Sequence, residues 1–314
     1  SMTDLEACLP ARLRGTPTTI TRIAAGLSGA GVYRVERAGQ VFVLKVSAAG
    51  ETLADWHAKL HLQGLAASAG LAPALVHADE AERATLSDFV ADRGFRAFYA
   101  NPETREAALT SLGRMLRRMH ELPLPAGAPP KDPLAFLALL GSALAGFALP
   151  AFVEEAIQRV RAEPPPPREQ PLVLSHNDVN PTNLVYDGEN LLLLDWDTAG
   201  PNDASYDLAT LAVFLRMDEG TCRALSSAYQ GRPVAELSAS FAYHRRLVAA
   251  LCGSAFLHLA RQGGHAGASG TESLGAVPAL GDVYQSLRSG ALSLAVSEGQ
   301  WWFGLALTKA SLEL

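Results

Sequence analysis

The chain has 314 residues, of which 48% are hydrophobic and 18% are charged, and its net charge is −6. This length suggests one sizeable domain or two lobes with a large buried core, while the negative charge disfavours nucleic acid as a partner. The chain has no apolar run of the roughly 20 residues that cross a bilayer, and its first residues do not form a signal segment. We therefore expect a globular cytoplasmic protein that binds neither nucleic acid nor membrane.

The three cysteines are far apart in the sequence and form no Cys-x-x-Cys pair. Their odd number and wide spacing argue against both a disulfide framework and a structural zinc site. We expect reduced, buried thiols at Cys8, Cys222 and Cys252.

Residues 18–47 have the pattern of an antiparallel β segment, in which β-branched residues are frequent and Ala38-Gly39 marks a turn. The glycine-rich run 26–31 connects two strands rather than a strand and a helix, so a dinucleotide-binding fingerprint fits poorly. A Walker loop is disfavoured as well, because no Gly-Lys-Ser/Thr follows. The pattern favours a glycine-rich hairpin over phosphate groups.

Lys45 lies on the same predicted strand face as Val41 and Val43, because side chains alternate with a period of two. Its charge thus emerges on a largely apolar face and needs an anionic partner. Two interpretations are open: an edge lysine with a solvated tip, or a lysine that neutralises nucleotide phosphates.

The middle of the chain is predicted to be mainly helical. Apolar residues recur at helical intervals in 51–69 and 105–122. A strand and a hinge are expected between them, at 84–90. Pro-rich stretches at 123–133 and 164–171 bracket a helical insert and act as stiff loops.

The segment 175–197, SHNDVNPTNLVYDGENLLLLDWD, concentrates polar side chains around short apolar runs. Asp178 falls in a loop after a buried strand, because Pro181 and the neighbouring Asn residues cannot continue that strand. The pair Asp187-Gly188 between two apolar runs is a strong hairpin signal. In such a hairpin Asn183 and Asp195 become neighbours, twelve residues apart in sequence.

This arrangement offers the three roles that phosphoryl transfer requires. One carboxylate orients the attacking hydroxyl, and an amide with a second carboxylate holds Mg²⁺ against nucleotide phosphates. Oxygen ligands from Asn183 and Asp195 suit Mg²⁺ better than zinc, for which only His176 lies nearby.

The pattern His-x-Asp-x-x-x-x-Asn, followed by an apolar hairpin that ends in Asp-Trp-Asp, resembles the aminoglycoside phosphotransferase and choline kinase family, relatives of the protein kinases. The resemblance implies an α+β, bilobal protein-kinase-like fold. An ATP-binding lobe with a small antiparallel β-sheet would span residues 1–87, and a larger, mainly helical lobe for catalysis and acceptor binding would span 88–314.

The resemblance also implies ATP and Mg²⁺ as cofactors and assigns roles to residues. Asp178 would deprotonate the acceptor hydroxyl, Asn183 and Asp195 would bind Mg²⁺, and Asp207 would support the catalytic loop. Asp197 would reach a second metal or the acceptor. The nucleotide would contact Ser28, Gly29, Ala30, Gly31 and Lys45 through its phosphates, and Asp88 and Val90 through adenine.

One departure from the family pattern concerns Lys45. Related kinases pair this lysine with a glutamate in the following helix, where the present chain has His57, Ala58 and Lys59. The departure supports a rival hypothesis, a nucleotide-binding module that has lost catalysis, whereas the intact Asp178, Asn183 and Asp195 favour an enzyme.

A small-molecule acceptor is indicated because only twelve residues separate Asp195 from Asp207, too few for the peptide platform of a protein kinase, and no Ala-Pro-Glu signature follows. The tail 216–314 reads as mainly helical, with a glycine-rich loop at 263–275, and would form the acceptor pocket. Its acids are scattered, whereas enzymes that bind polycationic antibiotics would be expected to cluster them.

We therefore expect phosphoryl transfer to an amine- or ammonium-bearing alcohol such as choline, ethanolamine or a thiamine-like compound. The aromatic run 301–303 could supply a cation–π cage, although consecutive helical residues face different ways, so at least one of its tryptophans belongs to the core. An aminoglycoside or macrolide phosphotransferase is the alternative. The sequence leaves the oligomeric state and the preference between ATP and GTP open.

Overall fold

The computed structural model describes residues 2–23 and 30–314. The chain divides into two compact units. Unit 1 comprises Ser1–Ala126 and Thr182–Ala199, and unit 2 comprises Gly127–Pro181 and Gly200–Leu314. Unit 1 thus takes in the predicted hairpin of the segment 175–197, while the extent of the ATP-binding lobe stays a prediction.

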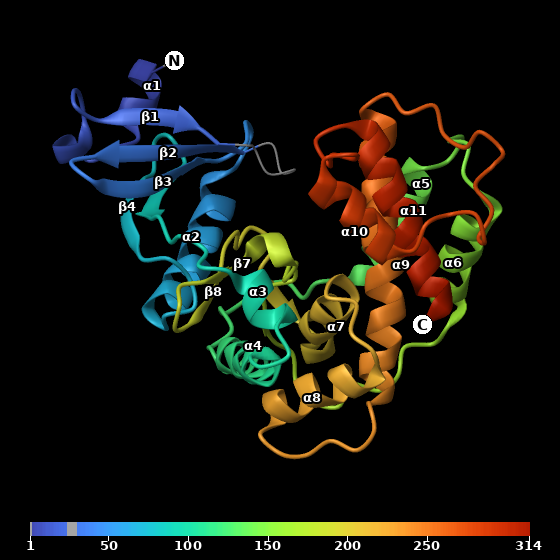
Figure 1. Cartoon of the computed structure of the whole chain (residues 1–314). Coiled ribbons are helices and arrows are strands. Elements are labelled where there is room, and N and C mark those ends of the chain that lie inside the picture. The colour runs from blue at the N-terminus through green and yellow to red at the C-terminus, as the bar shows by residue number, and fades with distance from the viewer. Residues whose placement is uncertain (1, 24–29) are drawn as a thin grey trace. The chain divides into compact units, whose positions relative to one another are not determined.

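A five-stranded antiparallel sheet forms the first part of unit 1 (Figure 1). Its order is β1-β2-β3-β5-β4, which confirms the antiparallel β segment predicted for 18–47. The fourth strand along the chain has no counterpart in the prediction. The strands are β1 (Thr19–Arg22), β2 (Gly31–Arg37), β3 (Gln40–Val46), β4 (Leu75–Asp79) and β5 (Ala84–Asp88).

The turn between β2 and β3 lies at the predicted place. Ala38 and Gly39 both have positive φ, 50° and 80°, the backbone conformation that suits a two-residue hairpin. Alternate residues Phe42 and Leu44 of β3 are buried in a small core. The helix α1 (Met2–Ala7) and the 3₁₀ turn η1 (Ala11–Leu13) flank this core with Leu9 and Leu13.

The helices of unit 1 and a second hairpin complete this unit. The helix predicted for 51–69 is α2 (Leu53–Ser68), and it begins at Thr52, whose side chain accepts a hydrogen bond from the Asp55 N–H. The hairpin pairs β7 (Leu184–Tyr186) with β8 (Leu191–Leu193), and the Leu193 N–H donates to the Leu71 carbonyl at 2.8 Å. The other helices are α3 (Phe95–Ala100) and α4 (Arg105–His120).

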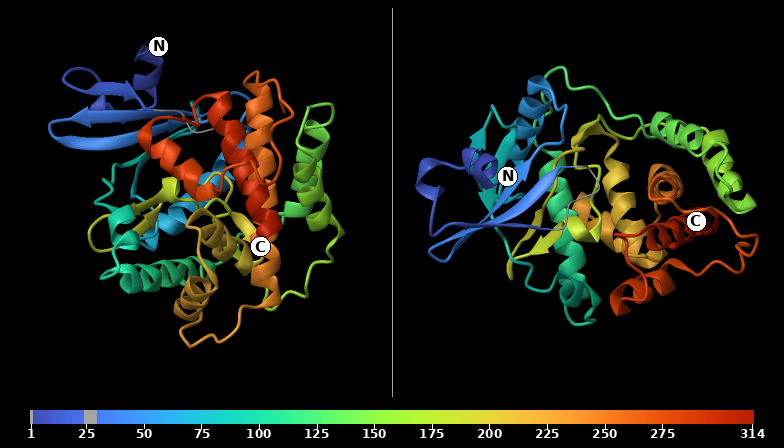
Figure 2. Two further views of the ribbon diagram at one scale, coloured as in Figure 1. Left: turned by 45° about the vertical axis from the view of Figure 1, so that its right-hand side comes forward. Right: turned by 90° about the horizontal axis from the view of Figure 1, so that it is seen from above.

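Unit 2 is built around the long helix α9 (Ala239–Gln262), which packs against α7 (Ala204–Phe214), α11 (Ser297–Glu313) and α5 (Pro133–Ala143). Figure 2 shows α9 and α11 side by side. Their close approach needs Gly253, because a Cβ there would lie 2.5 Å from Thr308 Oγ1. The remaining helices are α6 (Ala151–Ala162), α8 (Glu219–Gln230) and α10 (Leu280–Ser289).

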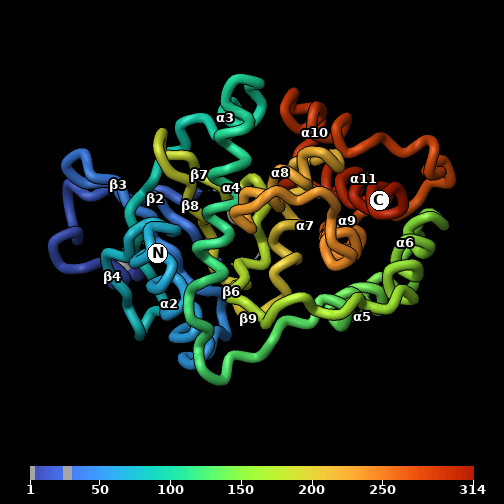
Figure 3. Tube along the Cα trace, turned by 90° about the horizontal axis from the view of Figure 1, so that it is seen from below, coloured from blue at the N-terminus to red at the C-terminus, as the bar shows by residue number. Residues whose placement is uncertain are grey.

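A short antiparallel pair, β6 (Val173–Ser175) with β9 (Gly200–Asn202), lies at the start of α7 (Figure 3). Residues 200–203, Gly-Pro-Asn-Asp, have the composition of a turn. The strand forms there because residues 200–202 pair with β6, about 27 residues earlier, and Gly-Pro-Asn carries no local strand signal. Residues 263–279 contain no helix or strand, as the glycine-rich stretch predicts.

Among the described residues, none of the helices has the length and apolar composition needed to span a bilayer.

Candidate active site

Lys45 and two carboxylates form a charged cluster in unit 1, which we call the lysine–carboxylate cluster. The Lys45 Nζ lies 3.2 Å from Asp195 Oδ1 and 2.6 Å from Asp197 Oδ2. The lysine comes from β3 and the two acids follow β8, about 150 residues later. The tertiary structure therefore supplies the anionic partner that the apolar surroundings of Lys45 require.

The position of Lys45 in the sheet explains its protonation state. The lysine lies on the half-buried face of β3, opposite the core residues Phe42 and Leu44. Burial by itself lowers the pKa of Lys45, but the charges of Asp195 and Asp197 outweigh it, so the pKa is raised above its ordinary value. The side chain is therefore a firmly protonated ammonium.

The loop after β8 is shaped so that both acids reach the lysine. Trp196 is buried and its Nε1 donates to the Leu193 carbonyl at 2.9 Å, which fixes the residue between the two aspartates. Asp195 has φ of 53°, a left-handed conformation that is uncommon outside glycine and is enriched in Asp and Asn. The Asp197 N–H donates to Asp195 Oδ1 at 3.2 Å and holds this turn.

Asn183 is held beside this loop by the β7–β8 hairpin. The strands pair Leu184 with Leu193, and the Leu194 N–H donates to the Asn183 carbonyl at 2.8 Å. The predicted neighbourhood of Asn183 and Asp195 at the ends of a hairpin is thereby confirmed, while their metal-binding role stays a prediction.

In unit 2, Asp207 organises the loop that follows β6. It lies in the first turn of α7, is 0% exposed, and accepts the backbone N–H groups of His176 at 3.0 Å and Asn177 at 2.9 Å. The Asp178 N–H donates to His176 Nδ1 at 3.2 Å, so this ring nitrogen serves as an acceptor. The geometry matches the supporting role expected for Asp207.

Three asparagines that the sequence did not single out, Asn177, Asn180 and Asn202, orient this loop. Asn180 donates from Nδ2 to Asp178 Oδ1 at 2.8 Å. Asn177 has φ of 68° and accepts a hydrogen bond from Asn202 Nδ2 at 2.9 Å. The frequent Asn residues between 177 and 183 could have indicated a role for Asn180. Asn202 reaches the loop only because β6 pairs with β9.

Tyr206 and Cys252 share the electrostatic surroundings of Asp178. Burial first, and then the charge of Asp178, raise the pKa of the Cys252 thiol to about 12. Burial, with smaller contributions that include Asp207 and Asp178, raises the pKa of Tyr206 well above its ordinary value. Both side chains are therefore neutral at physiological pH. No local sequence pattern indicated either residue.

The predicted nucleotide contacts are only partly described. Ser28 and Gly29 lie outside the described residues; Ala30 is buried and Gly31 opens β2. Asp88 ends β5, and its N–H donates to the Ala74 carbonyl at 2.9 Å, so this N–H is engaged. The contact of Asp88 and Val90 with adenine stays a prediction.

Lys59 and His57 of helix α2 pair with acids outside the helix. Glu51, just before the helix, forms an ion pair with Lys59 at 3.0 Å, and His57 contacts Glu80 at 3.0 Å. The carboxylates that meet Lys45 in this structure are Asp195 and Asp197.

The aromatic run 301–303 belongs largely to the core of unit 2. Trp301 and Phe303 are buried, with Trp301 stacked on His265 at 4.4 Å between ring centroids. Trp302 is half-buried, and its Nε1 donates to Glu298 Oε1 at 2.8 Å. Two of the three rings are therefore unable to line a cation cage.

The donor atoms of the candidate metal site are hard oxygens. Among residues 2–23 and 30–314, no three His, Cys, Asp or Glu side chains gather in a way that could hold a metal ion. One carboxylate and one amide, from Asp195 and Asn183, fit Mg²⁺, which usually takes few protein ligands and completes its shell with water and substrate phosphates.

Solved structures with the same fold include kinases of two kinds. A choline/ethanolamine kinase family protein from Mesorhizobium loti is 20% identical, with a TM-score of 0.62 over 100% of this chain and 96% of that one. A spectinomycin phosphotransferase in complex with ADP and spectinomycin is 14% identical, with a TM-score of 0.61 over 94% of each chain. The choline kinase LicA from Streptococcus pneumoniae is 15% identical, with a TM-score of 0.57 over 78% and 86%.

These likenesses confirm the α+β kinase-like fold that the motif implied. No curated protein sequence matches this chain significantly. The model of the phosphotransferase enzyme family matches residues 19–263, which include the glycine-rich run, Lys45 and the whole segment 175–197. The chain belongs to the phosphotransferase enzyme family.

Proposed function

We propose that the protein transfers the γ-phosphoryl group of ATP, with Mg²⁺, to a hydroxyl group of a small molecule. The observation that carries the proposal is the lysine–carboxylate cluster, which joins a strand lysine to the acids of the Asp-Trp-Asp motif. Family membership supports the reaction type. A cytoplasmic location remains an expectation from the sequence.

The residues of unit 1 would bind the nucleotide. Lys45 contributes a fixed positive charge for ATP phosphates, and Asn183 and Asp195 would hold Mg²⁺, which neutralises charge on the transferring group. Asp197 lies nearer to Lys45 than Asp195 does, so we assign it the role of holding the ammonium in place. It takes over the task that a helix glutamate has in related kinases.

Asp178 would act as the base in unit 2. Its carboxylate accepts the proton of the acceptor O–H as the hydroxyl oxygen bonds to the γ-phosphorus, and the bond from that phosphorus to the bridging oxygen breaks to release ADP. The hydrogen bond from Asn180 to Asp178 Oδ1 orients the carboxylate. Tyr206 and Cys252 are neutral at physiological pH, so neither of them adds a charge to the surroundings of Asp178.

For the acceptor we propose an amine- or ammonium-bearing alcohol. The scattered acids of the tail and the similarity to a choline/ethanolamine kinase family protein support this choice. Because Trp301 and Phe303 are buried, the amine or ammonium group of the acceptor must be bound by residues outside the run 301–303. An antibiotic acceptor is the second candidate, because the fold matches a spectinomycin phosphotransferase about equally well.

The test is phosphate transfer from ATP to a panel of choline, ethanolamine, a thiamine-like alcohol and aminoglycosides, using the wild type and Asp178→Asn. We expect the variant to lose about 10² to 10⁴-fold in turnover, the usual contribution of a general base, and to keep its affinity for Mg-ATP. Asp187→Asn, at the exposed hairpin turn, is the matched control and should transfer normally.

Two results would contradict the proposal in different ways. Wild-type transfer by Asp178→Asn would show that Asp178 is not the base. Tight Mg-ATP binding by the wild type without transfer to any acceptor would favour a nucleotide-binding module over an enzyme.

A further inference from the structure

A cavity of about 250 Å³ in unit 2 is lined by three cationic side chains. Arg216 follows α7, Arg245 belongs to α9 and Lys309 to α11, while one acidic side chain, Glu313, also lines it. The side chains that line this cation-lined cavity therefore carry a net positive charge, whereas the net charge of the chain is −6. Such a local excess of positive charge favours the binding of an anion.

Arg245 is a buried cation in the lining of this cavity. The residue is only 8% exposed and its Nη2 donates to the Met217 carbonyl at 3.1 Å, but its Nε–H is buried and has no hydrogen-bond partner among the described residues. A buried charge is costly unless it is paired and fully hydrogen-bonded. Because Arg245 lines the cavity, an anion bound there would offset this cost through its charge.

Arg216 and Lys309 are held at the cavity without a carboxylate partner in the described part of the chain. The Arg216 guanidinium lies 5.8 Å from the ring centroid of Tyr284. It also lies close against Gly281, where a Cβ would come within 2.4 Å of Nη1. Lys309 Nζ donates to the Val277 carbonyl at 2.8 Å. Neutral groups thus position both cations and leave their charges available.

The beginning of α10 adds backbone donors. The helix has ten residues and starts after Ala279, which provides no side-chain cap. The N–H groups in the first turn of a helix lack intrahelical acceptors, and this end of the helix dipole attracts anions. Leu280 and Gly281 of this turn line the cavity.

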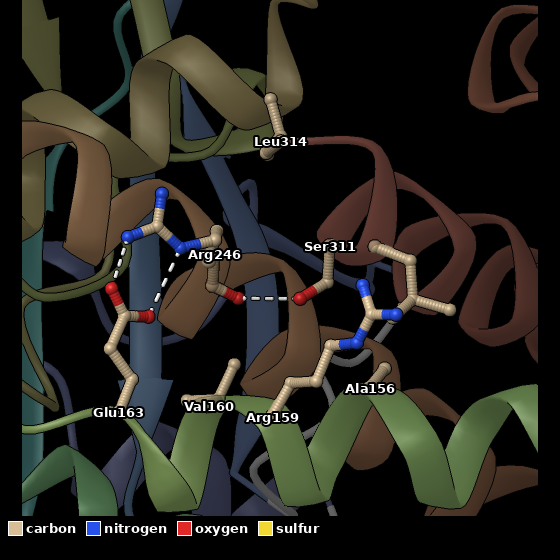
Figure 4. A pocket seen from close by; sticks show the side chains of 8 residues that line it. Ala156, Arg159, Val160, Glu163, Arg246, Ser311 and Leu314 are labelled. Carbon is tan, nitrogen blue, oxygen red and sulfur yellow. Dashed lines mark hydrogen bonds and ion pairs between the residues drawn. The ribbon is translucent and has the colours of Figure 1, made fainter.

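A second cavity of equal volume shows the ordinary arrangement (Figure 4). There Arg246 forms a two-pronged ion pair with Glu163, with Nε 3.1 Å from Oε2, and Arg159 pairs with Glu155 at 2.7 Å. Its arginines are neutralised within the protein. Those of the cation-lined cavity are not, and this difference singles the cavity out.

We propose that the cation-lined cavity binds a phosphate group, either as inorganic phosphate or as part of a small phosphomonoester. Phosphate carries about −1.5 to −2 charges and several strong acceptor oxygens, which match two guanidinium groups, one ammonium and a helix start. The volume is several times the roughly 30 Å³ share of one water in the liquid, so an organic group attached to the phosphate also fits.

This site is separate from the residues proposed for catalysis in the same unit. Asp207 lies in the first turn of α7, and Arg216 follows the end of this helix at Phe214, about 10 Å further along at 1.5 Å per residue. The inference does not depend on the proposed transfer reaction, and either one can fail without the other.

The test is titration of the purified chain with inorganic phosphate and with glycerol 3-phosphate by calorimetry, against sodium chloride at equal ionic strength. We expect the double variant Arg216→Gln/Lys309→Gln to bind phosphate at least about 10-fold more weakly. Gly281→Ala retains every charge but displaces the Arg216 guanidinium, and should weaken binding several-fold. Arg223→Gln, an exposed α8 arginine near Glu219 at 3.7 Å, is the control and should bind normally.

A Lys45→Met variant removes the cation proposed to bind the phosphates of ATP. If phosphate binds in the cation-lined cavity, this variant should keep the affinity of the wild type for phosphate. Tighter binding of glycerol 3-phosphate than of phosphate would identify a phosphomonoester as the ligand, and equal or weaker binding would identify free phosphate. Unchanged affinity in both the double variant and Gly281→Ala would overturn the proposal. A loss of phosphate affinity in Lys45→Met alone would also overturn it. The same holds if sodium chloride gives a binding signal equal to that of phosphate.

Discussion

Two aspartates twelve residues apart, Asp195 and Asp207, serve opposite purposes. Asp207 is fully buried, and its two oxygens accept backbone N–H groups from His176 and Asn177. Asp195 has a side chain that is 35% exposed and meets the ammonium of Lys45. A carboxylate bound on both oxygens by the backbone stabilises a loop, whereas a partly exposed carboxylate that meets a lysine is also accessible to a metal ion.

The largest effect is expected from Asp207→Ala. The variant leaves two backbone N–H groups without their charged acceptor, and each such hydrogen bond contributes about 1.5–3 kcal/mol. We expect a loss of about 3–5 kcal/mol in the free energy of unfolding, measured by urea denaturation.

Asp203→Ala is the matched control on the same helix. Asp203 caps α7 by accepting a single N–H, that of Ser205 at 2.8 Å, so its removal should cost about 1 kcal/mol. Equal losses in the two variants would refute a special supporting role for Asp207.

Asp195→Ala should change the stability of the fold little and the affinity for nucleotide strongly. Because the ion pair with Lys45 is partly exposed, its loss changes the free energy of unfolding by no more than about 1 kcal/mol. Affinity for ATP in the presence of Mg²⁺ should fall by at least about 10-fold, a difference of about 1.4 kcal/mol.

Calorimetry with and without EDTA measures this effect. The wild type should lose affinity when EDTA removes the metal, and Asp195→Ala should not respond to EDTA. A variant that keeps metal-dependent binding would exclude Asp195 as a ligand.

The smallest effect concerns the pH dependence of stability. The folded-state pKa of Lys45 is raised, because the attraction of Asp195 and Asp197 exceeds the effect of burial. The stabilisation is therefore complete below the ordinary lysine pKa of 10.5 and is lost as the pH rises through the higher folded-state value. We expect at most about 1 kcal/mol.

Urea denaturation of the wild type and Lys45→Met between pH 8 and 11 follows this effect. Arg117→Met, which removes an exposed pair with Glu121, serves as a control whose difference from the wild type should stay constant over this range. A constant difference for Lys45→Met as well would mean that the charge of Lys45 does not stabilise the fold.

The local features of the candidate site were predictable from the sequence. The Asp187-Gly188 turn and the apolar runs beside it predict the hairpin that brings Asn183 next to the Asp195 loop. The period of two in β3 predicts that Lys45 shares a face with Val41 and Val43. Such features depend on residues within a few positions of one another, which is where propensity and alternation have their effect.

The short pairing of β6 with β9 was not predictable in this way. Residues 200–202 have little strand propensity, and they form a strand because residues 173–175 offer a partner. Asn202 thereby reaches Asn177 and joins the loop that carries Asp178.

By itself, the sequence determined the reaction family, because the motif around Asp178, Asn183 and Asp195 keeps its spacing along one segment. Only the tertiary structure decided which acids hold Lys45, since β3 and the Asp195 loop are 150 residues apart. It also brought Arg216 and Arg245 to one cavity. Contacts of this kind follow from the packing of whole helices and strands, and no local pattern encodes them.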